Sequence, residues 1–343
     1  MQLRMANSAG GSQFSLLRER RFLPYFAAQV LSAVPALACV ALAGAAPAIA
    51  ATSPAPAPPA ARAVALRTVP DDLGHAVRVP APPLRIVSLT PGGTEMLFAA
   101  GAGAQVIATV EYADQPPAAR AIARIGDVAA LDMERLVAVR PDVLVAWPAG
   151  GNPAQRQKLG ALGLPVYEQQ VERLADLPGS LRRLGVLAGT EAAAQRAARD
   201  LEERLAALAR AYADGAGGGG RRPTVLLQVW NRPIYTVGGR QLMSDALATC
   251  GARNAFADLA EAGPVVDTEA VIARNPDIIL AAAPPGEGAA WVADWRRFGM
   301  LAAVRSGRVV VFEDQALSRL GPSVVDATEK LCRTIAGAIR GNY

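Results

Sequence analysis

The stretch Thr190–Ala213 reads TEAAAQRAARDLEERLAALARAYA and contains no glycine or proline. Alanine, leucine, glutamate, arginine and glutamine fill most of it, and these residues lose least free energy on entering a helix. Thr190 is suited to cap its N-terminus. At 1.5 Å per residue such a helix is roughly 36 Å long, more than one crossover in a small α/β lobe requires. Its apolar residues recur on one helix face: Ala194, Ala198, Leu201, Leu205, Leu208 and Tyr212. The stretch therefore predicts a long helix that joins two lobes.

A phrase of sequence before this helix recurs after it. Each copy predicts a helix capped by an aspartate, an exposed glutamate in its first turn, a Pro-Asp stop and a buried strand. Six residues match at a shift of 135 positions: Asp132, Glu134, Ala138, Pro141, Asp142 and Ala146 recur as Asp267, Glu269, Ala273, Pro276, Asp277 and Ala281. Strands and helices alternate on both sides of the long helix, which favours parallel sheets.

The predicted fold is α/β, with two Rossmann-like lobes of mostly parallel sheets joined by one long bridging α-helix. The chain is expected to divide into a signal peptide (1–50), a Pro/Ala-rich linker (51–83), an N-terminal lobe (84–173), a bridging helix segment with a Gly-rich loop (174–222) and a C-terminal lobe (223–343). A short strand is expected near Ala76–Val79 within the linker.

The N-terminus has the pattern of an export signal. A basic segment, Arg18–Arg21, precedes a mostly apolar run that ends in the small-x-small triplet Ala48-Ile49-Ala50. We therefore expect cleavage near Ala50 and a periplasmic location. A membrane anchor, lipid attachment through Cys39 and a choice between the general and twin-arginine export routes remain open.

Composition excludes several functions. The net charge is +5, and residues 1–50 carry three of those charges, so the remainder is too weakly basic to indicate nucleic-acid binding. His75 is the only histidine. A single histidine argues against a Ser-His-Asp triad, a Cys-His nucleophile and a His-rich metal cluster. Because His75 falls in the expected linker, it is predicted to be a surface residue.

Candidate binding residues follow the predicted strands. Ligands of paired α/β lobes bind at the carboxyl ends of strands and between the lobes. The residues at these positions are Pro91, Tyr112, Trp147, Trp230, Tyr235, Asp314 and Arg319. Aromatic residues make up only 5% of the chain, so their concentration here predicts flat apolar walls for a large planar ligand. The alternative is that Trp147 and Trp230 merely cap the cores.

These patterns resemble the cobalamin-binding branch of the class III, or helical-backbone, substrate-binding proteins of bacterial ABC importers. The resemblance covers about residues 85–339. Its marks are Arg85–Pro91 with Thr94-Glu95, Tyr112–Asp114 with Pro116-Pro117, Met133–Ala138 with Pro141-Asp142, Ala146-Trp147 with Gly150–Asn152, Cys250-Gly251 with Asn254, and Arg319 with Pro322 and Cys332.

The resemblance implies functions for individual residues. Tyr112, Trp147 and Tyr235 would contact a corrin ring, and Asp314 and Arg319 would reach its periphery. Exposed Glu134 and Glu269 would dock to arginines of the transmembrane permease.

It also implies a disulfide between Cys250 and Cys332, the even pair left after signal cleavage; two buried free thiols are the alternative. The protein is then a non-enzymatic, monomeric carrier without catalytic residues, cofactor or metal.

Two departures from the family pattern keep other ligands open. Val128 and Gly263 stand where close relatives have tryptophans, and one extra residue separates Asp314 from Arg319. Haem or an iron-siderophore is therefore the alternative ligand. A Rossmann-type oxidoreductase is a remote alternative, because neither the glycine fingerprint nor an acid–base residue is visible. A structural or sensory two-lobed protein also remains.

Overall fold

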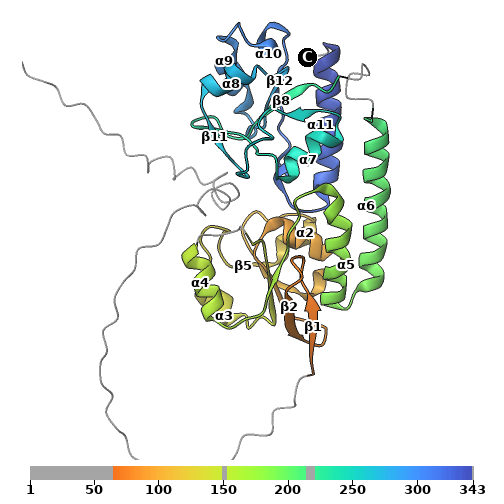
Figure 1. The fold of residues 1–343 in the computed structure, drawn as a ribbon. Coiled ribbons are helices and arrows are strands. Elements are labelled where there is room, and N and C mark those ends of the chain that lie inside the picture. Colours follow the sequence, from red (N-terminus) through yellow and green to blue (C-terminus); the bar gives the residue numbers. More distant parts are fainter. Residues whose placement is uncertain (1–64, 149–152, 214–220, 342–343) are drawn as a thin grey trace, which may run out of the picture.

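Two parallel sheets follow one another along the chain, on either side of the longest helix (Figure 1). The computed structural model describes residues 65–148, 153–213 and 221–341. The expected signal peptide, most of the linker, Cys39 and the glycine-rich loop lie outside these residues. Within the described part of the chain, no helix is long and apolar enough to cross a membrane.

The first sheet has the strand order β5-β4-β3-β6-β7, and all of its pairs are parallel. Its strands are β3 (Ile86–Ser88), β4 (Val106–Thr109), β5 (Ala123–Arg124), β6 (Val143–Ala146) and β7 (Val166–Glu168). The helices and 3₁₀ turns between them are α2 (Pro91–Ala99), η3 (Gly103–Gln105), η4 (Pro117–Ala121), α3 (Met133–Ala138) and α4 (Pro153–Ala161). The chain first winds outward from β3 and then returns to its other side at β6, so the strand order reverses between β3 and β6.

The second sheet repeats this plan with the order β10-β8-β12-β13, also parallel throughout. Its strands are β8 (Thr224–Gln228), β10 (Arg253–Asn254), β12 (Ile278–Ala281) and β13 (Val309–Val311). A separate antiparallel pair joins β9 (Ile234–Tyr235) to β11 (Val265–Val266). The accompanying helices are α7 (Leu242–Thr249), α8 (Thr268–Arg274), α9 (Gly288–Arg296), α10 (Ala302–Arg305), η6 (Gln315–Ser318) and α11 (Ser323–Arg340). Here the order reverses between β8 and β12.

The phrase that recurs at a shift of 135 positions makes equivalent contacts in the two lobes. Asp142 Oδ2 accepts the N–H of Arg85 at 2.7 Å, and Asp277 Oδ2 accepts the N–H of Thr224 at 2.8 Å. Each aspartate thus joins the start of one strand to the start of its neighbour. The predicted caps are also present, since Asp132 accepts from Arg135 N and Asp267 from Ala270 N. The predicted fold class is confirmed.

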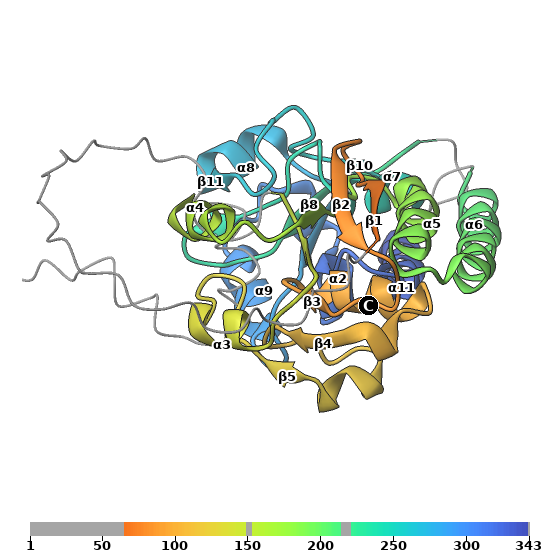
Figure 2. The ribbon, with the colours of Figure 1, turned by 90° about the horizontal axis from the view of Figure 1, so that it is seen from below.

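The bridging helix is α6 (Glu191–Ala211), which runs beside both lobes (Figure 1). Its predicted apolar face is buried at Ala194, Ala198, Leu201 and Leu208. The Thr190 side chain does not cap it, because its hydroxyl donates to the carbonyl of Ala100 at 2.7 Å. A second helix that the sequence analysis did not predict, α5 (Leu177–Ala188), follows η5 (Leu174–Asp176) and packs along α6 (Figure 2).

The hydrophobic core is continuous through both lobes. One cluster of buried residues contains Ile86 and Met96 of the first lobe, Leu184 of α5, Ala198 of α6 and Leu227 of the second lobe. Arg204 on α6 also pairs with Asp326 on α11. Because the helices fill the space between the lobes with apolar contacts, opening the lobes would expose this core to water.

The expected linker is structured at its C-terminal end, which corrects that part of the prediction. β1 (Leu66–Pro70) and β2 (Ala76–Pro80) form an antiparallel hairpin, of which only the strand near Ala76–Val79 was expected. Val69, Val77 and Val79 join the core of the first lobe. Alternate residues face the core, but the short strands and flanking prolines concealed this period-two pattern in the sequence.

The C-terminal helix α11 completes the second lobe. It is 18 residues long, and its apolar residues Val324, Val325, Leu331 and Ile335 are all fully buried. A disulfide joins Cys332 on this helix to Cys250 at the end of α7, with their Cα atoms 4.7 Å apart. The predicted pairing is confirmed, and the alternative of two free thiols is wrong.

Candidate ligand-binding cleft between the lobes

The carboxyl ends of the two sheets face each other across the junction of the lobes. Arg319, which follows β13 and η6, forms an ion pair with Asp114 beyond β4, and their nitrogen and oxygen atoms lie 2.8 Å apart. At the N-terminus of α2, a side chain at Gly92 would stand 2.7 Å from the backbone nitrogen of Leu320. Glycine is therefore required at this position, since any larger residue would push the lobes apart.

A pocket lies at the carboxyl edge of the first sheet, where its strand order reverses. It encloses about 180 Å³ and is mostly apolar. Its lining includes Thr90 after β3 and Trp147 after β6, the two strands between which the order reverses. Crevices at such reversal points are the usual ligand sites of open α/β sheets. Val128, the residue that replaces an expected tryptophan, lies in the same lining.

The matching position in the second lobe holds a smaller pocket, of about 20 Å³. It is lined by Val229 after β8, Ala282 and Ala283 after β12, and Asp314. The drug-sized ligands of proteins generally occupy about 300–1,000 Å³. Neither pocket reaches that volume, so neither could enclose a large ligand by itself.

The predicted aromatic residues differ in exposure. Tyr112 is 48% exposed and has a left-handed backbone, with φ of 63°. Trp147 is half-buried against Val110 and Val128. Trp230 is half-buried and meets the edge of Trp291 at a centroid distance of 6.3 Å. Tyr235 is half-buried in β9. Trp147 and Trp230 therefore do pack against the cores of their lobes, and both also retain exposed surface.

The remaining predicted residues are held by defined contacts. Pro91 is buried as the first residue of α2. Asp314 caps η6 through the N–H of Ala316, and its other oxygen lies 3.6 Å from Lys330 Nζ. The Arg319 side chain is only 17% exposed, and its ion pair with Asp114 offsets the cost of burying the charge.

Two contacts between the lobes were not predicted by the sequence analysis, although Asp114 and Glu95 both stand in its quoted motifs. Asp114 pairs across the cleft, and Glu95 links the lobes beneath it by accepting hydrogen bonds from the N–H and the hydroxyl of Ser323. The motifs that contain Asp114 and Glu95 carry no signal for their partners, which lie more than 200 positions further along the chain. Burial raises the pKa of the Glu95 carboxyl above its ordinary value of 4.5, and the bonds from Ser323 oppose this rise.

Glu95 therefore gives a stability prediction. Because its pKa is higher in the folded than in the unfolded protein, wild type should lose stability relative to Glu95→Gln as the pH rises above about 4.5, until the folded-state pKa is passed. Glu95→Ala should cost about 1–3 kcal/mol, since Ser323 N–H loses its acceptor. Urea unfolding between pH 4 and 8 measures both, and a wild-type advantage that grows with pH would contradict the expectation.

A larger hollow than these two pockets, of about 540 Å³, lies elsewhere on the second lobe. It is lined by residues of the β9–β11 pair, α9 and the start of α8, including Glu269. None of the predicted corrin contacts lines it. Glu134 and Glu269 occupy equivalent exposed positions in the first turns of α3 and α8. No ion-pair partner for either glutamate is found among residues 65–148, 153–213 and 221–341.

Comparison with known proteins identifies the class. Residues 86–316 match the periplasmic binding protein family, and the chain belongs to that family. Such proteins bind solutes for transport. The vitamin B12-binding protein of Vibrio cholerae serotype O1 is 31% identical over 254 residues, which cover 74% of this chain and 89% of that protein.

Solved structures agree on the fold. The crystal structure of the periplasmic vitamin B12-binding protein BtuF of Vibrio cholerae superposes with a TM-score of 0.66 at 30% identity, covering 75% of this chain and 98% of that one. A periplasmic heme-binding protein from Pseudomonas aeruginosa superposes with a TM-score of 0.62 at 26% identity, covering 72% and 91%. The predicted family and its two-lobed fold are confirmed.

Proposed function

We propose that this protein is a non-enzymatic periplasmic carrier that binds cobalamin or a related corrinoid between its lobes and delivers it to an ABC importer. The observation that carries the proposal is a pocket at the strand-order reversal of each sheet, together with the Arg319–Asp114 ion pair that joins the carboxyl sides of the two sheets. The similarity to vitamin B12-binding proteins supports the choice of ligand.

The residues fit a ligand held by its faces and edges. Trp147, Tyr112 and Tyr235 provide flat apolar surfaces, and Asp314 and Arg319 provide polar groups at the margin. Arg319 would exchange its contact with Asp114 for contacts with amide side chains of the ligand. The metal of the macrocycle would receive no ligand from these residues.

Haem is the second candidate, because Tyr112 is the most exposed of these aromatic residues and a tyrosine can ligate haem iron. The similarity to a heme-binding protein supports this alternative. A haem ligated by Tyr112 or Tyr235 would show a charge-transfer spectrum that the corresponding Phe variant loses. Haem bound by the faces of its ring alone would not.

Calorimetric titration of the exported protein with cyanocobalamin and, separately, with haemin tests the proposal. We expect saturable binding of one cyanocobalamin per chain and weak or no binding of haemin. Tight binding of haemin with no heat from cyanocobalamin would exclude the corrinoid.

Two variants locate the site in the same titration. Trp147→Ala should weaken binding by about 2–4 kcal/mol, since truncating a buried aromatic anchor removes the apolar wall of the first-lobe pocket. Phe298→Ala alters the larger hollow of the second lobe and should leave affinity unchanged. The opposite pattern would move the ligand to that hollow.

The division of the chain fits delivery by a soluble, monomeric carrier. We infer a signal peptide at 1–50, lobes at 84–173 and 223–343, and a bridging segment at 174–222. Exposed Glu134 and Glu269, one on each lobe, would contact the two permease subunits.

A further inference from the structure

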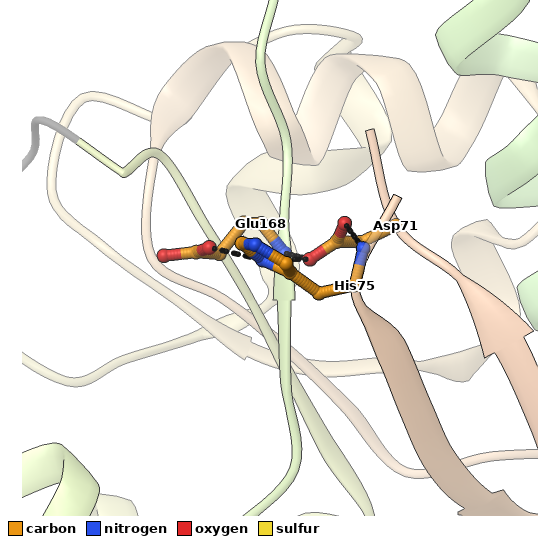
Figure 3. Close-up of side chains that lie close together, drawn as sticks. All are labelled: Asp71, His75 and Glu168. Atoms are coloured by element: carbon orange, nitrogen blue, oxygen red, sulfur yellow. Dashed lines mark hydrogen bonds and ion pairs between the residues drawn. The ribbon is translucent and has the colours of Figure 1, made fainter. Parts of the chain in front are cut away.

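The chain's single histidine lies between two carboxylates. His75 Nδ1 stands 3.1 Å from Glu168 Oε2 and 3.5 Å from Asp71 Oδ2 (Figure 3). His75 and Asp71 belong to the turn between β1 and β2, whereas Glu168 ends β7, so the fold joins two distant segments here. One ligand atom from each residue lies within 4.8 Å of the others.

We propose that Asp71, His75 and Glu168 bind one divalent transition-metal ion of the Zn²⁺ type. Ligand atoms of a tetrahedral zinc ion with bonds of about 2.0 Å stand about 3.3 Å apart. The two distances from His75 Nδ1 bracket this value. A ligand set of one imidazole and two carboxylates suits zinc and its neighbours better than Mg²⁺ or Ca²⁺, which prefer oxygen alone.

The charge of Asp71 favours the binding of a cation at this cluster. Its side chain is only 1% exposed, yet no lysine or arginine lies within ion-pair distance of Asp71 or Glu168 in the described ranges. The adjacent Asp72 differs, because Arg183 Nε lies 2.7 Å from its Oδ1. The groups around this buried carboxylate are backbone N–H donors and His75, with no lysine or arginine of the described ranges among them, and a buried charge without such a partner is costly.

The surrounding contacts orient the ligands. The N–H groups of Leu73 and His75 donate to Asp71 Oδ1 at 2.9 and 2.8 Å, and the N–H of Glu168 donates to Oδ2 at 3.4 Å, so backbone groups from both segments hold this carboxylate beside the histidine. Such outer hydrogen bonds fix the ligands of metal sites. The histidine side chain is 66% exposed and that of Glu168 33% exposed, so an ion can enter and water can complete its coordination. In the bound form Nδ1 would hold the metal and Nε2 the proton.

The proposal revises the expectation of no metal site, which rested on the small number of histidines. Bound metal would fasten the β1–β2 turn to the end of β7. Glu168 also lines the first-lobe pocket, so this ion would lie beside the cleft. The site does not depend on which ligand the cleft carries.

Titration of tag-free protein with ZnCl₂ tests the site, because a purification tag would itself bind zinc. We expect one ion per chain by calorimetry and a matching shift of the only histidine ring signals in the NMR spectrum. His75→Gln and Glu168→Gln should each weaken zinc binding at least about tenfold. Asp71 is left unchanged because it organises the turn.

Glu172→Gln is the matched control, since this carboxylate lies on the same segment but outside the cluster. It should bind zinc like the wild type, and MgCl₂ should not compete. Absence of saturable zinc binding with unshifted His75 signals would overturn the proposal. Undiminished binding in His75→Gln would overturn it as well.

Discussion

The double variant Glu134→Ala, Glu269→Ala is expected to bind its ligand like the wild type and to support no uptake. The two side chains occupy matching positions in the repeat, and both are exposed. Each also complements its helix dipole, a contribution of only about 0.3–1 kcal/mol, so folding should survive. Charge pairs at the rim of an interface mainly set orientation and association rate. Loss of both would leave the carrier unable to align with its permease.

Uptake of labelled cobalamin into vesicles that contain the importer measures this effect. Each single variant should retain partial activity, because one lobe can still dock. Glu191→Ala with Glu203→Ala removes the same charge from α6 and should transport normally. Normal uptake by the Glu134/Glu269 variant, at unchanged ligand affinity, would show that these residues have another function.

Replacing Cys250 and Cys332 with alanine is expected to lower the free energy of unfolding by about 4 kcal/mol. The disulfide closes a long loop, because the two residues are 82 positions apart, and the chain-entropy model assigns a large effect to such a loop. Both cysteines are fully buried between α7 and α11. Neither lines the cleft pockets, so ligand affinity should change little.

Chemical denaturation of the two proteins measures the loss directly. Reduction of the wild type should reproduce it, while the Cys250→Ala, Cys332→Ala variant should be insensitive to reductant. A loss below about 1 kcal/mol would indicate that positions 250 and 332 stay close in the unfolded chain even without the disulfide. Mass spectrometry after alkylation of non-reduced protein establishes the starting state.

The features predicted correctly from sequence were local or periodic. The apolar face of α6 and the 135-residue repeat each appear as a spacing that needs no knowledge of partners. Helix α5 was not predicted, because the proline and glycines of Leu177-Pro178-Gly179 and Gly185 are typical of positions where a helix ends. In the structure, Pro178 lies in the first turn, where its missing N–H costs nothing, and Gly185 allows contact with Ala194 of α6.

The contacts that define the cleft could not be predicted in the same way. Arg319 with Asp114 and Ser323 with Glu95 join residues that only the complete fold brings together. The burial of Asp71 likewise depends on the β1–β2 hairpin, whose strands are too short to show a clear alternation of apolar and polar residues in the sequence. Strand ends could be located from sequence, but the pairing of charges across two lobes could not.

The buried face of α11 also constrains the order in which the protein can fold. This helix is the last described element of the chain, yet its apolar residues fill the second lobe and Ser323 at its start meets Glu95 of the first. A chain folded only as far as the end of β13 would still expose the apolar surface that α11 covers. The docking of α11 therefore couples the folding of the second lobe to that of the first.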